Sequence, residues 1–377
     1  MNLRRLRAVW KKEYLHIVRD PISLTLALVL PLSMILLFGY ALTLDVDRIP
    51  TFVYDQDKTP ESRELIDQFR GSRYFQIRGV VDSYRPAERS IDKSSVLMTL
   101  AVDKNYAKDL LAGKEANVQL LLDGSDSNTA SIALGYAQAI VATYTLQKRS
   151  DAQVRLGGGQ LKTPVEPRIR VWYNSDLKSK NFIVPGLIAV TLMIIASLLT
   201  SLTIAREWEN GTMEQLLSTP LRPVEMVLGK LLAYFALGIT DMIICLLAAV
   251  FVFQVPLRGN VWFLFFTACV FLIGTLSWGL FISASCRTQL LAYQMGMLSS
   301  FLPGYLLSGF LYSISNMPKV IQLVSYLVPA RYFIKIINSI FLKGMGFGTL
   351  YIEVLLLSVY AGIVFVASVR KMRLKVA

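Results

Sequence analysis

The acid-rich segment at residues 206–230 carries the side chains whose pattern best suits a specific function. It reads REWENGTMEQLLSTPLRPVEMVLGK and lies between two long apolar stretches. Four acids outnumber three bases there, namely Glu207, Glu209, Glu214 and Glu225 against Arg206, Arg222 and Lys230. Acids beside an apolar pair, Leu216 and Leu217, suit docking into a groove on a partner protein. An ordinary solvated loop is the alternative interpretation.

Turn signals indicate how this segment folds. Asn210-Gly211 marks a turn, and Thr212 can cap a short helix over Met213–Ser218. Pro220 ends that helix, and Pro223 begins the next one. The residues predicted to form the docking site are Arg206, Glu207, Glu209, Gly211, Thr212, Glu214, Leu216, Leu217 and Pro220.

Residues for catalysis or metal binding are scarce. His16 is the single histidine, and its basic surroundings favour a surface role. The three cysteines, Cys245, Cys269 and Cys286, lie in or beside apolar runs, which argues against a disulfide framework or a zinc site. The run Gly157–Gly159 is not followed by Lys and Ser/Thr, so it indicates a flexible turn and not a phosphate-binding loop. We expect no catalytic residue, metal or cofactor in this chain.

The composition indicates a membrane protein. Of 377 residues, 54% are hydrophobic and only 17% are charged, and the formal net charge is +13. Soluble domains carry about a quarter charged residues. The numbers therefore disfavour a disordered chain, a secreted disulfide scaffold and an ordinary cytosolic enzyme.

Six stretches reach the roughly 20 apolar residues that a helix needs to cross a bilayer. They are 22–44, 181–204, 231–253, 261–284, 289–312 and 350–369. The sequence therefore predicts an α-helical polytopic membrane protein with six transmembrane helices. The fourth and fifth stretches are separated only by Ser285–Thr288, so we expect them to form a hairpin.

The basic residues orient the chain. Residues 1–21 hold six basic and two acidic residues, and the tail at 370–377 holds four basic residues and no acid. The positive-inside rule places both ends in the cytoplasm and residues 45–180 outside. This clustering beside apolar stretches gives no reason to invoke nucleic acid.

The first 21 residues predict an amphipathic helix lying in the membrane interface. Its apolar stripe would contain Leu3, Leu6, Val9, Trp10, Leu15 and Val18. Trp10 would lie at headgroup depth, with the basic side chains opposite, and Asp20-Pro21 would end the helix. A cleaved signal peptide is the alternative, but its apolar core would be shorter than the stretch at 22–44.

Residues 45–180 predict an inserted mixed α/β domain, because strand-like and helical runs alternate. We expect strands at 49–54, 74–81, 96–102, 118–122 and 169–173, and helices at 60–70, 106–112 and 129–155. Thr59 is the expected N-cap of the first helix. Asp123, Asp126 and Asn128 invite a calcium interpretation, but the loop lacks the glycine and final Glu of an EF-hand, so a helix-capping turn is favoured.

Two acids lie in apolar stretches. Asp241 falls in the middle of the third stretch, where an acid is costly and faces a cavity or a partner. It could line a translocation path, or it could bond to a neighbouring helix. Glu353 would be interfacial. In residues 301–349, an apolar stretch is interrupted by Pro303, Gly304, Gly309, Pro318 and Pro329, so this backbone would be buried by protein or lie beside a water-filled cavity; an ordinary loop with one amphipathic helix is the alternative.

The acid-rich segment resembles the signature R-E-x-E-x-G-T-x-E-x-L-L-x-T-P of the ABC-2 family of ABC transporter permeases. The resemblance is to the bacterial exporter type with a large external domain, and it extends over nearly the whole chain. The matching residues are Arg206, Glu207, Glu209, Gly211, Thr212, Glu214, Leu216, Leu217, Thr219 and Pro220. The segments LLSGFLYSISNMP at 306–318 and YLVPARYF at 326–333 also match.

The resemblance implies a permease subunit of an exporter in the bacterial inner membrane. Residues 205–230 would hold the coupling helix, seated on a separate ABC ATPase subunit that binds ATP and magnesium. The helix at 1–21, with Arg5, Trp10 and Lys11, would be the connecting helix at the same interface. A second copy or a similar chain would complete the path, and residues 313–349 would close it from outside. The external domain is a candidate docking site for a periplasmic adaptor.

Two other functions stay open from the residues themselves. The chain could be a membrane-anchored sensor or assembly factor that acts through its external domain. It could also be a secondary transporter driven by ions through Asp241. The sequence does not choose among drugs, lipids, polysaccharides and ions as the substrate.

Overall fold

The computed structural model describes residues 2–41, 48–155, 172–174 and 178–372. It divides into two units, one containing Met1–Thr43 with Val171–Ala377 and the other Leu44–Arg170. The glycine run at 157–159 and most of the predicted strand at 169–173 lie outside the described residues.

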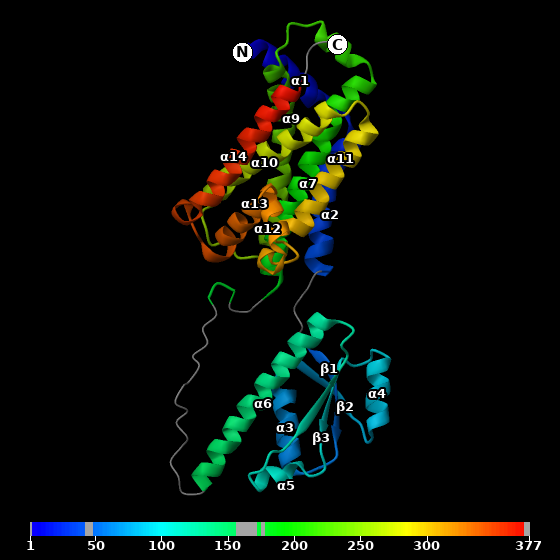
Figure 1. The fold of residues 1–377 in the computed structure, drawn as a ribbon, viewed down its shortest axis with the longest axis vertical. Coiled ribbons are helices and arrows are strands. Elements are labelled where there is room, and N and C mark those ends of the chain that lie inside the picture. Colours follow the sequence, from blue (N-terminus) through cyan, green and yellow to red (C-terminus); the bar gives the residue numbers. More distant parts are fainter. Residues whose placement is uncertain (1, 42–47, 156–171, 175–177, 373–377) are drawn as a thin grey trace. The chain divides into compact units, whose positions relative to one another are not determined.

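The first unit is helical (Figure 1). Its α-helices are α1 (Leu3–Arg19), α2 (Pro21–Ala41), α7 (Lys180–Glu209), α8 (Thr212–Leu217), α9 (Pro223–Leu247), α10 (Val261–Ser285), α11 (Gln289–Leu302), α12 (Lys319–Ser325), α13 (Pro329–Asn338) and α14 (Phe347–Lys371). Short π-helical turns follow three of them, at Ala248–Val252, Pro303–Leu307 and Ser339–Lys343, and a 3₁₀ turn lies at Ile314–Asn316.

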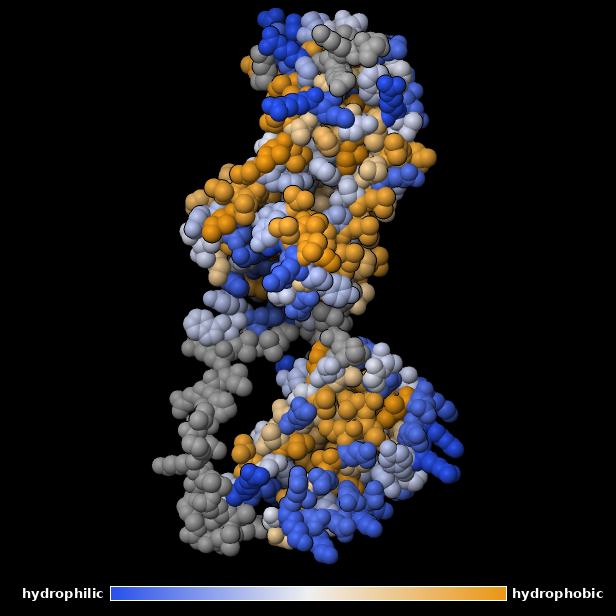
Figure 2. All heavy atoms as spheres, viewed as in Figure 1, coloured by the Kyte–Doolittle hydropathy of each residue, from blue (hydrophilic) through white to orange (hydrophobic). Residues whose placement is uncertain are grey.

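Four helices in the described residues are long and apolar enough to cross a membrane. They are α7, α9 with its π-helical turn, α10 and α14, and they correspond to four of the predicted spans. The pair α12 and α13 raises the number to five if it counts as one span, but it bends by 83°. In Figure 2, hydrophobic residues dominate the sides of this unit, and hydrophilic residues gather at the end that holds the N-terminus.

Helix α2 follows the predicted span at 22–44 as far as the described residues reach. One other predicted span is shorter than expected. Helix α11 ends at Leu302, so the predicted span at 289–312 is wrong in its extent. Proline at position 303 lacks an N–H group, and the backbone continues as a π-helical turn before it leaves the helix.

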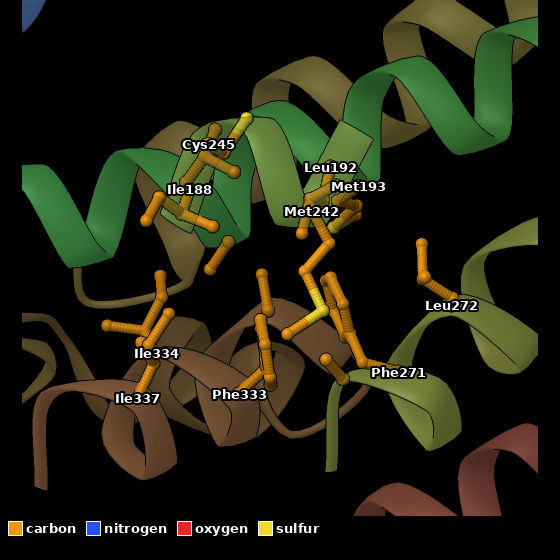
Figure 3. Packing of buried hydrophobic residues seen from close by; sticks show 14 of the residues in the cluster. Ile188, Leu192, Met193, Met242, Cys245, Phe271, Leu272, Phe333, Ile334 and Ile337 are labelled. Atoms are coloured by element: carbon orange, nitrogen blue, oxygen red, sulfur yellow. The ribbon is translucent and has the colours of Figure 1, made fainter. Parts of the chain in front are cut away.

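Helix α7 forms the centre of this unit, because nearly all of its residues are buried. It packs against α2, α10, α11 and α13. The approach to α10 requires glycine, since a Cβ added at Gly279 would lie 2.0 Å from the hydroxyl of Thr200. Figure 3 shows Met242, Phe271 and Phe333 meeting in this core. The rings of Phe271 and Phe333 stack with centroids 4.3 Å apart, which fixes α13 against α10.

The second unit is a four-stranded mixed sheet with helices, as the alternation of strand-like and helical runs predicts. Its elements are β1 (Ile49–Asp55), α3 (Pro60–Gly71), β2 (Phe75–Val80), α4 (Tyr84–Asp92), β3 (Met98–Val102), α5 (Tyr106–Leu111), β4 (Val118–Leu122) and α6 (Ser127–Arg155). The strand order is β2-β1-β3-β4, and only the β3–β4 pair is antiparallel.

In this unit, two predicted helix caps are confirmed, and one helix was not predicted. Thr59 caps α3 by accepting from the backbone N–H of Ser62. Asp126 accepts from both the N–H and the hydroxyl of Thr129, so the turn after β4 caps α6 as predicted. Helix α4 was not predicted, because it is short and mostly polar and buries a single residue, Ala87.

Candidate functional site

The acid-rich segment begins on helix α7 and turns at Asn210-Gly211, where the sequence predicts a turn. Helix α7 continues to Glu209, so Arg206, Glu207 and Glu209 lie on its last turns and not in a loop. Gly211 follows with a left-handed φ of 70°, which glycine adopts without strain. Helix α8 therefore begins at Thr212, whose hydroxyl donates to the carbonyl of Glu207 at 3.3 Å and does not cap the helix. The predicted N-cap role of Thr212 is wrong for this reason.

Helix α1 packs along α9 at this end of the unit. Its buried residues, Val9, Glu13 and Ile17, are spaced four apart and so share one face. The contact is close, since a Cβ added at Gly229 of α9 would lie 2.6 Å from a methyl carbon of Val9. The N-terminus is also held, because the N–H of Asn2 donates to Glu225 at 2.7 Å. Arg5 donates to the carbonyl of Pro220.

A buried ion network joins α1, α7 and α9. The Lys230 ammonium lies 2.8 Å from Glu13 and 3.0 Å from Glu207, and its side chain is 1% exposed. Lys12 also contacts the Glu207 carboxylate, at 2.5 Å, and Glu13, at 3.3 Å. Two cations and two carboxylates thus compensate one another, which a stable buried charge requires; Glu13, Glu207 and Lys230 are buried, whereas the Lys12 side chain is half exposed.

The network shifts the pKa of two of its groups. Burial alone would raise the pKa of the Glu13 carboxyl, but Lys230 and Lys12 lower it below its usual range. Burial alone would lower the pKa of Lys12, but Glu207 and Glu13 raise it above its usual range. Both groups are therefore charged at neutral pH.

Other predicted site residues hold neighbouring helices together. The Glu209 carboxylate accepts from the backbone N–H of Gln289 at 2.7 Å, at the start of α11. The Arg206 guanidinium contacts the Gln289 side chain at 3.2 Å, Asp20 at 3.6 Å and the His16 ring nitrogen at 2.7 Å. These residues position the segment, and their charges are already used within the chain.

A groove of about 690 Å³ lies between α1, the end of α7 and α8. Its lining includes Lys12, His16, Arg19, Arg206, Glu207, Thr212, Gln215, Leu216, Thr219 and Tyr234. Of the predicted acids, only Glu214 is exposed without a hydrogen bond or ion pair in the described part of the chain. Within α8, the side chain of Met213 is buried, and this burial holds the short helix in place. The side chain of Leu217 lies outside the described residues.

The predicted residues of α1 divide between its two sides. Arg5 bonds to Pro220, whereas Lys11 is exposed and Trp10 is half-exposed with its ring stacked on Tyr14 at 5.8 Å. Three further residues of the site, Glu13, Gly229 and Lys230, were not predicted from the sequence. The sequence signal for Glu13 was its spacing. It lies four residues from both Val9 and Ile17, and this places an acid on the same helix face as two apolar residues.

Asp241 lies apart from this site, inside the helical unit. It is 2% exposed and accepts from the Cys245 thiol at 3.4 Å. A cavity of about 10 Å³ beside it is walled by apolar residues of α2, α7, α9 and α10. Glu353, which was expected to be interfacial, pairs with Lys335 and so joins α14 to α13.

Comparison with known proteins gives one consistent group. The model of the ABC-2 family transporter protein matches residues 22–370. The probable multidrug ABC transporter permease YbhS of Escherichia coli K12 is 36% identical over 346 residues, which cover 91% of this chain and 90% of that protein. The probable multidrug ABC transporter permease YbhR of the same organism is 32% identical over 339 residues, covering 90% of each. ABC transporter G family member 20 of Dictyostelium discoideum is 22% identical over 95% of this chain and 49% of its own length.

Proposed function

This chain belongs to the ABC-2 family of transporter permeases, and from that premise we propose how it couples to its energy source. It is the membrane permease subunit of an ABC exporter, in the inner membrane. A separate ABC ATPase subunit docks in the groove between α1 and α8, and ATP and magnesium bind to that subunit. No catalytic residue, metal or cofactor is assigned to this chain.

The buried ion network carries this proposal. A partner seated on α8 and α1 must move the membrane helices if ATP is to drive transport. Glu207 belongs to α7, Lys230 to α9, and Lys12 and Glu13 to α1, and the four side chains form one connected group. A displacement of α1 at the groove is therefore transmitted to the central helix and to its neighbour.

The docking surface consists of the side chains that the network leaves free. We assign Glu214, Gln215 and Leu216 of α8, with Arg19 of α1, to the ATPase contact, because they are exposed or line the groove. Arg206, Glu207, Glu209, Gly211 and Thr212 keep α8 in position. Pro220, held by Arg5, ends the segment.

The topology proposed here has six spans and both termini in the cytoplasm. The site residues then lie on the cytoplasmic side, and residues 45–180 form a periplasmic domain. Residues 313–349 provide the outer re-entrant helices, a role that the 83° bend between α12 and α13 supports. A second copy or a similar chain completes the path, and a periplasmic adaptor docks on the external domain.

The transported compounds proposed are drugs, by analogy with YbhS and YbhR, whose names describe probable multidrug permeases. Asp241 is assigned to the translocation path. Its burial next to a small cavity between four helices supports a role that changes when those helices separate.

The deciding experiment is reconstitution with the ATPase subunit. Inverted membrane vesicles that contain both subunits should accumulate a fluorescent amphipathic drug when ATP is added. The variant Glu214→Arg should lose both ATPase binding and transport, whereas Glu61→Arg in the other unit should change neither. Full ATP-driven transport by the permease variant Glu214→Arg would contradict the docking surface. Drug accumulation without the ATPase subunit would contradict the coupling.

A further inference from the structure

The outer face of α1 is apolar and uncovered. Leu3, Trp10, Tyr14 and Val18 are all exposed, and the rings of Trp10 and Tyr14 stack on each other. Helical spacing places these four on one side of α1, next to the line of Val9, Glu13 and Ile17 that packs on α9. An aromatic pair of this kind is typical of a helix at headgroup depth in a membrane interface.

Three cations accompany this apolar face. Arg4, Arg7 and Lys11 are exposed, and within the described residues their side chains make no hydrogen bond or ion pair. Arg7 precedes Trp10 by three residues, and Lys11 precedes Tyr14 by three, so each cation lies beside an aromatic ring. Arg5 and Lys12, by contrast, are bound within the protein.

No exposed acid of α1 balances these charges. Glu13 is buried in the ion network, and Asp20, just after the helix, contacts Arg206. The face is therefore positive as well as apolar. Lys12 and His16 line the groove on the other side of α1, so this face is separate from the proposed ATPase site.

The chain path keeps the end of α1 next to the start of α2. Helix α1 ends at Arg19 and the apolar helix α2 begins at Pro21, so Asp20 alone connects them. A single residue spans less than about 4 Å, and the packing of α1 along α9 holds the rest of the helix against the same unit.

We infer that the outer face of α1, formed by Leu3, Arg4, Arg7, Trp10, Lys11, Tyr14 and Val18, binds acidic phospholipid headgroups. The apolar side chains lie at the boundary with the acyl chains, and the three cations contact the phosphates. Each cation attracts the anionic headgroups of the leaflet, so acidic lipids are concentrated at this face relative to neutral ones. This inference does not depend on the docking of the ATPase.

Local lipid composition around Trp10 tests the inference. The full-length permease is placed in nanodiscs of phosphatidylcholine and phosphatidylglycerol, with bromine on the acyl chains of one lipid or the other at equal mole fractions. The contribution of Trp10 is the difference in tryptophan quenching between the wild type and Trp10→Phe. We expect brominated phosphatidylglycerol to quench Trp10 about twofold more than brominated phosphatidylcholine. High salt should reduce this preference.

Two charge-matched variants complete the test. Neutralisation of the face by Arg4→Gln, Arg7→Gln and Lys11→Gln should abolish the preference. Neutralisation of three other exposed cations by Arg287→Gln, Arg370→Gln and Lys371→Gln should retain it. Equal quenching by the two lipids, or an unchanged preference in the first variant, would overturn the inference. Loss of ATPase binding in the first variant with an unchanged lipid preference would assign the face to the protein partner instead.

Discussion

The ammonium group of Lys230 lies 2.8 Å from the carboxylate of Glu13, although 217 residues separate them in the sequence and both side chains are buried. This pair attaches the N-terminal helix to α9. Glu207 on α7 and Lys12 on α1 complete the arrangement. Each of the four charges contacts both charges of opposite sign, so removal of any one leaves two charges with a single partner instead of two.

Removal of Lys230 should be strongly destabilising. In Lys230→Met the buried Glu13 and Glu207 would retain only Lys12, and breaking a buried pair in this way costs about 3–5 kcal/mol. The double variant Lys230→Met with Glu13→Gln should recover part of that loss, because one uncompensated carboxylate disappears. Heat-induced unfolding of the purified protein in detergent measures both effects.

The matched control is Lys335→Met, which breaks the more exposed pair with Glu353. Its cost should stay within about 1 kcal/mol, as for surface ion pairs. Equal stability losses in Lys230→Met and Lys335→Met would show that the buried network contributes no more to the free energy of unfolding than an exposed ion pair.

Stability should depend on pH through Glu13 and Lys12 at opposite ends of the scale. The pKa of folded Glu13 is lowered from 4.5, so its contribution is complete above that value and is lost as pH falls through the lower folded pKa. The pKa of folded Lys12 is raised from 10.5, so its contribution is complete below that value and is lost as pH rises through the higher folded pKa. Between the two values these groups should leave the unfolding temperature unchanged.

Glu13→Gln provides the control for this pH profile. The variant should be less stable at neutral pH, and it should lose less stability than the wild type on acidification. An identical acid-induced loss in wild type and variant would show that Glu13 titrates in the same way in the folded and unfolded states.

The close contact between α1 and α9 should depend on glycine at position 229. Gly229→Ala introduces a Cβ about 2.6 Å from Val9, a separation that requires the two helices to move apart. We expect lower stability and weaker binding of the ATPase subunit. Adding Val9→Ala should restore only part of both, because it removes the clashing methyl carbon but keeps the Val9 Cβ, which lies 2.7 Å from the added Cβ. Gly362→Ala on α14, where a Cβ meets nothing within 4 Å, is the control.

The acids of the site should separate into positioning and docking residues. Glu214→Gln should weaken ATPase binding and leave the unfolding temperature unchanged, because the side chain is exposed and unpaired in the described residues. Glu207→Gln should lower the unfolding temperature, because Lys230 and Lys12 both contact that carboxylate. Affinity between purified subunits and thermal unfolding distinguish the two. A stability loss from Glu214→Gln with normal ATPase affinity would reverse the assignment.

Asp241 should matter for transport and not for subunit assembly. Asp241→Asn retains the size of the side chain and its ability to accept from Cys245, but removes the carboxylate. We expect ATP hydrolysis and subunit binding to persist while drug accumulation falls at least about tenfold, the scale of losing a charge-assisted contact. Unchanged transport by Asp241→Asn would exclude the residue from the path.

Much of the helical unit was predictable because a long membrane-crossing helix requires a continuous apolar stretch, which is visible in the sequence. The helices α7, α9, α10 and α14 appear as apolar stretches in the sequence, and Pro223 and Asn210-Gly211 indicate where helices begin and end. Helix α11 was misjudged because its apolar residues continue beyond Leu302, while the backbone stops following the α-helix at Pro303. Apolar composition indicates where such helices lie, but it does not indicate where the backbone departs from the α-helix.

The candidate site was predictable in its location and not in its internal contacts. The pattern around Arg206 indicated a functional segment, yet the partners of Glu207 come from α1 and from Lys230. Pairings of this kind depend on how three helices pack, and one sequence contains no record of that packing. The acids were therefore expected to face a partner protein, although most of them face other parts of this chain.

Glu207 and Glu209 lie only two positions apart on the last turns of α7, and they hold different helices. Glu207 binds Lys12 and Lys230 on α1 and α9, whereas Glu209 accepts from the first backbone N–H of α11. Residues two apart project from nearly opposite sides of a helix. A sideways shift of this end of α7 toward α1 and α9 would therefore draw the Glu209 carboxylate away from α11. Through these two carboxylates, the end of α7 links α1 and α9 on one side to α11 on the other, so the positions of these helices depend on one another.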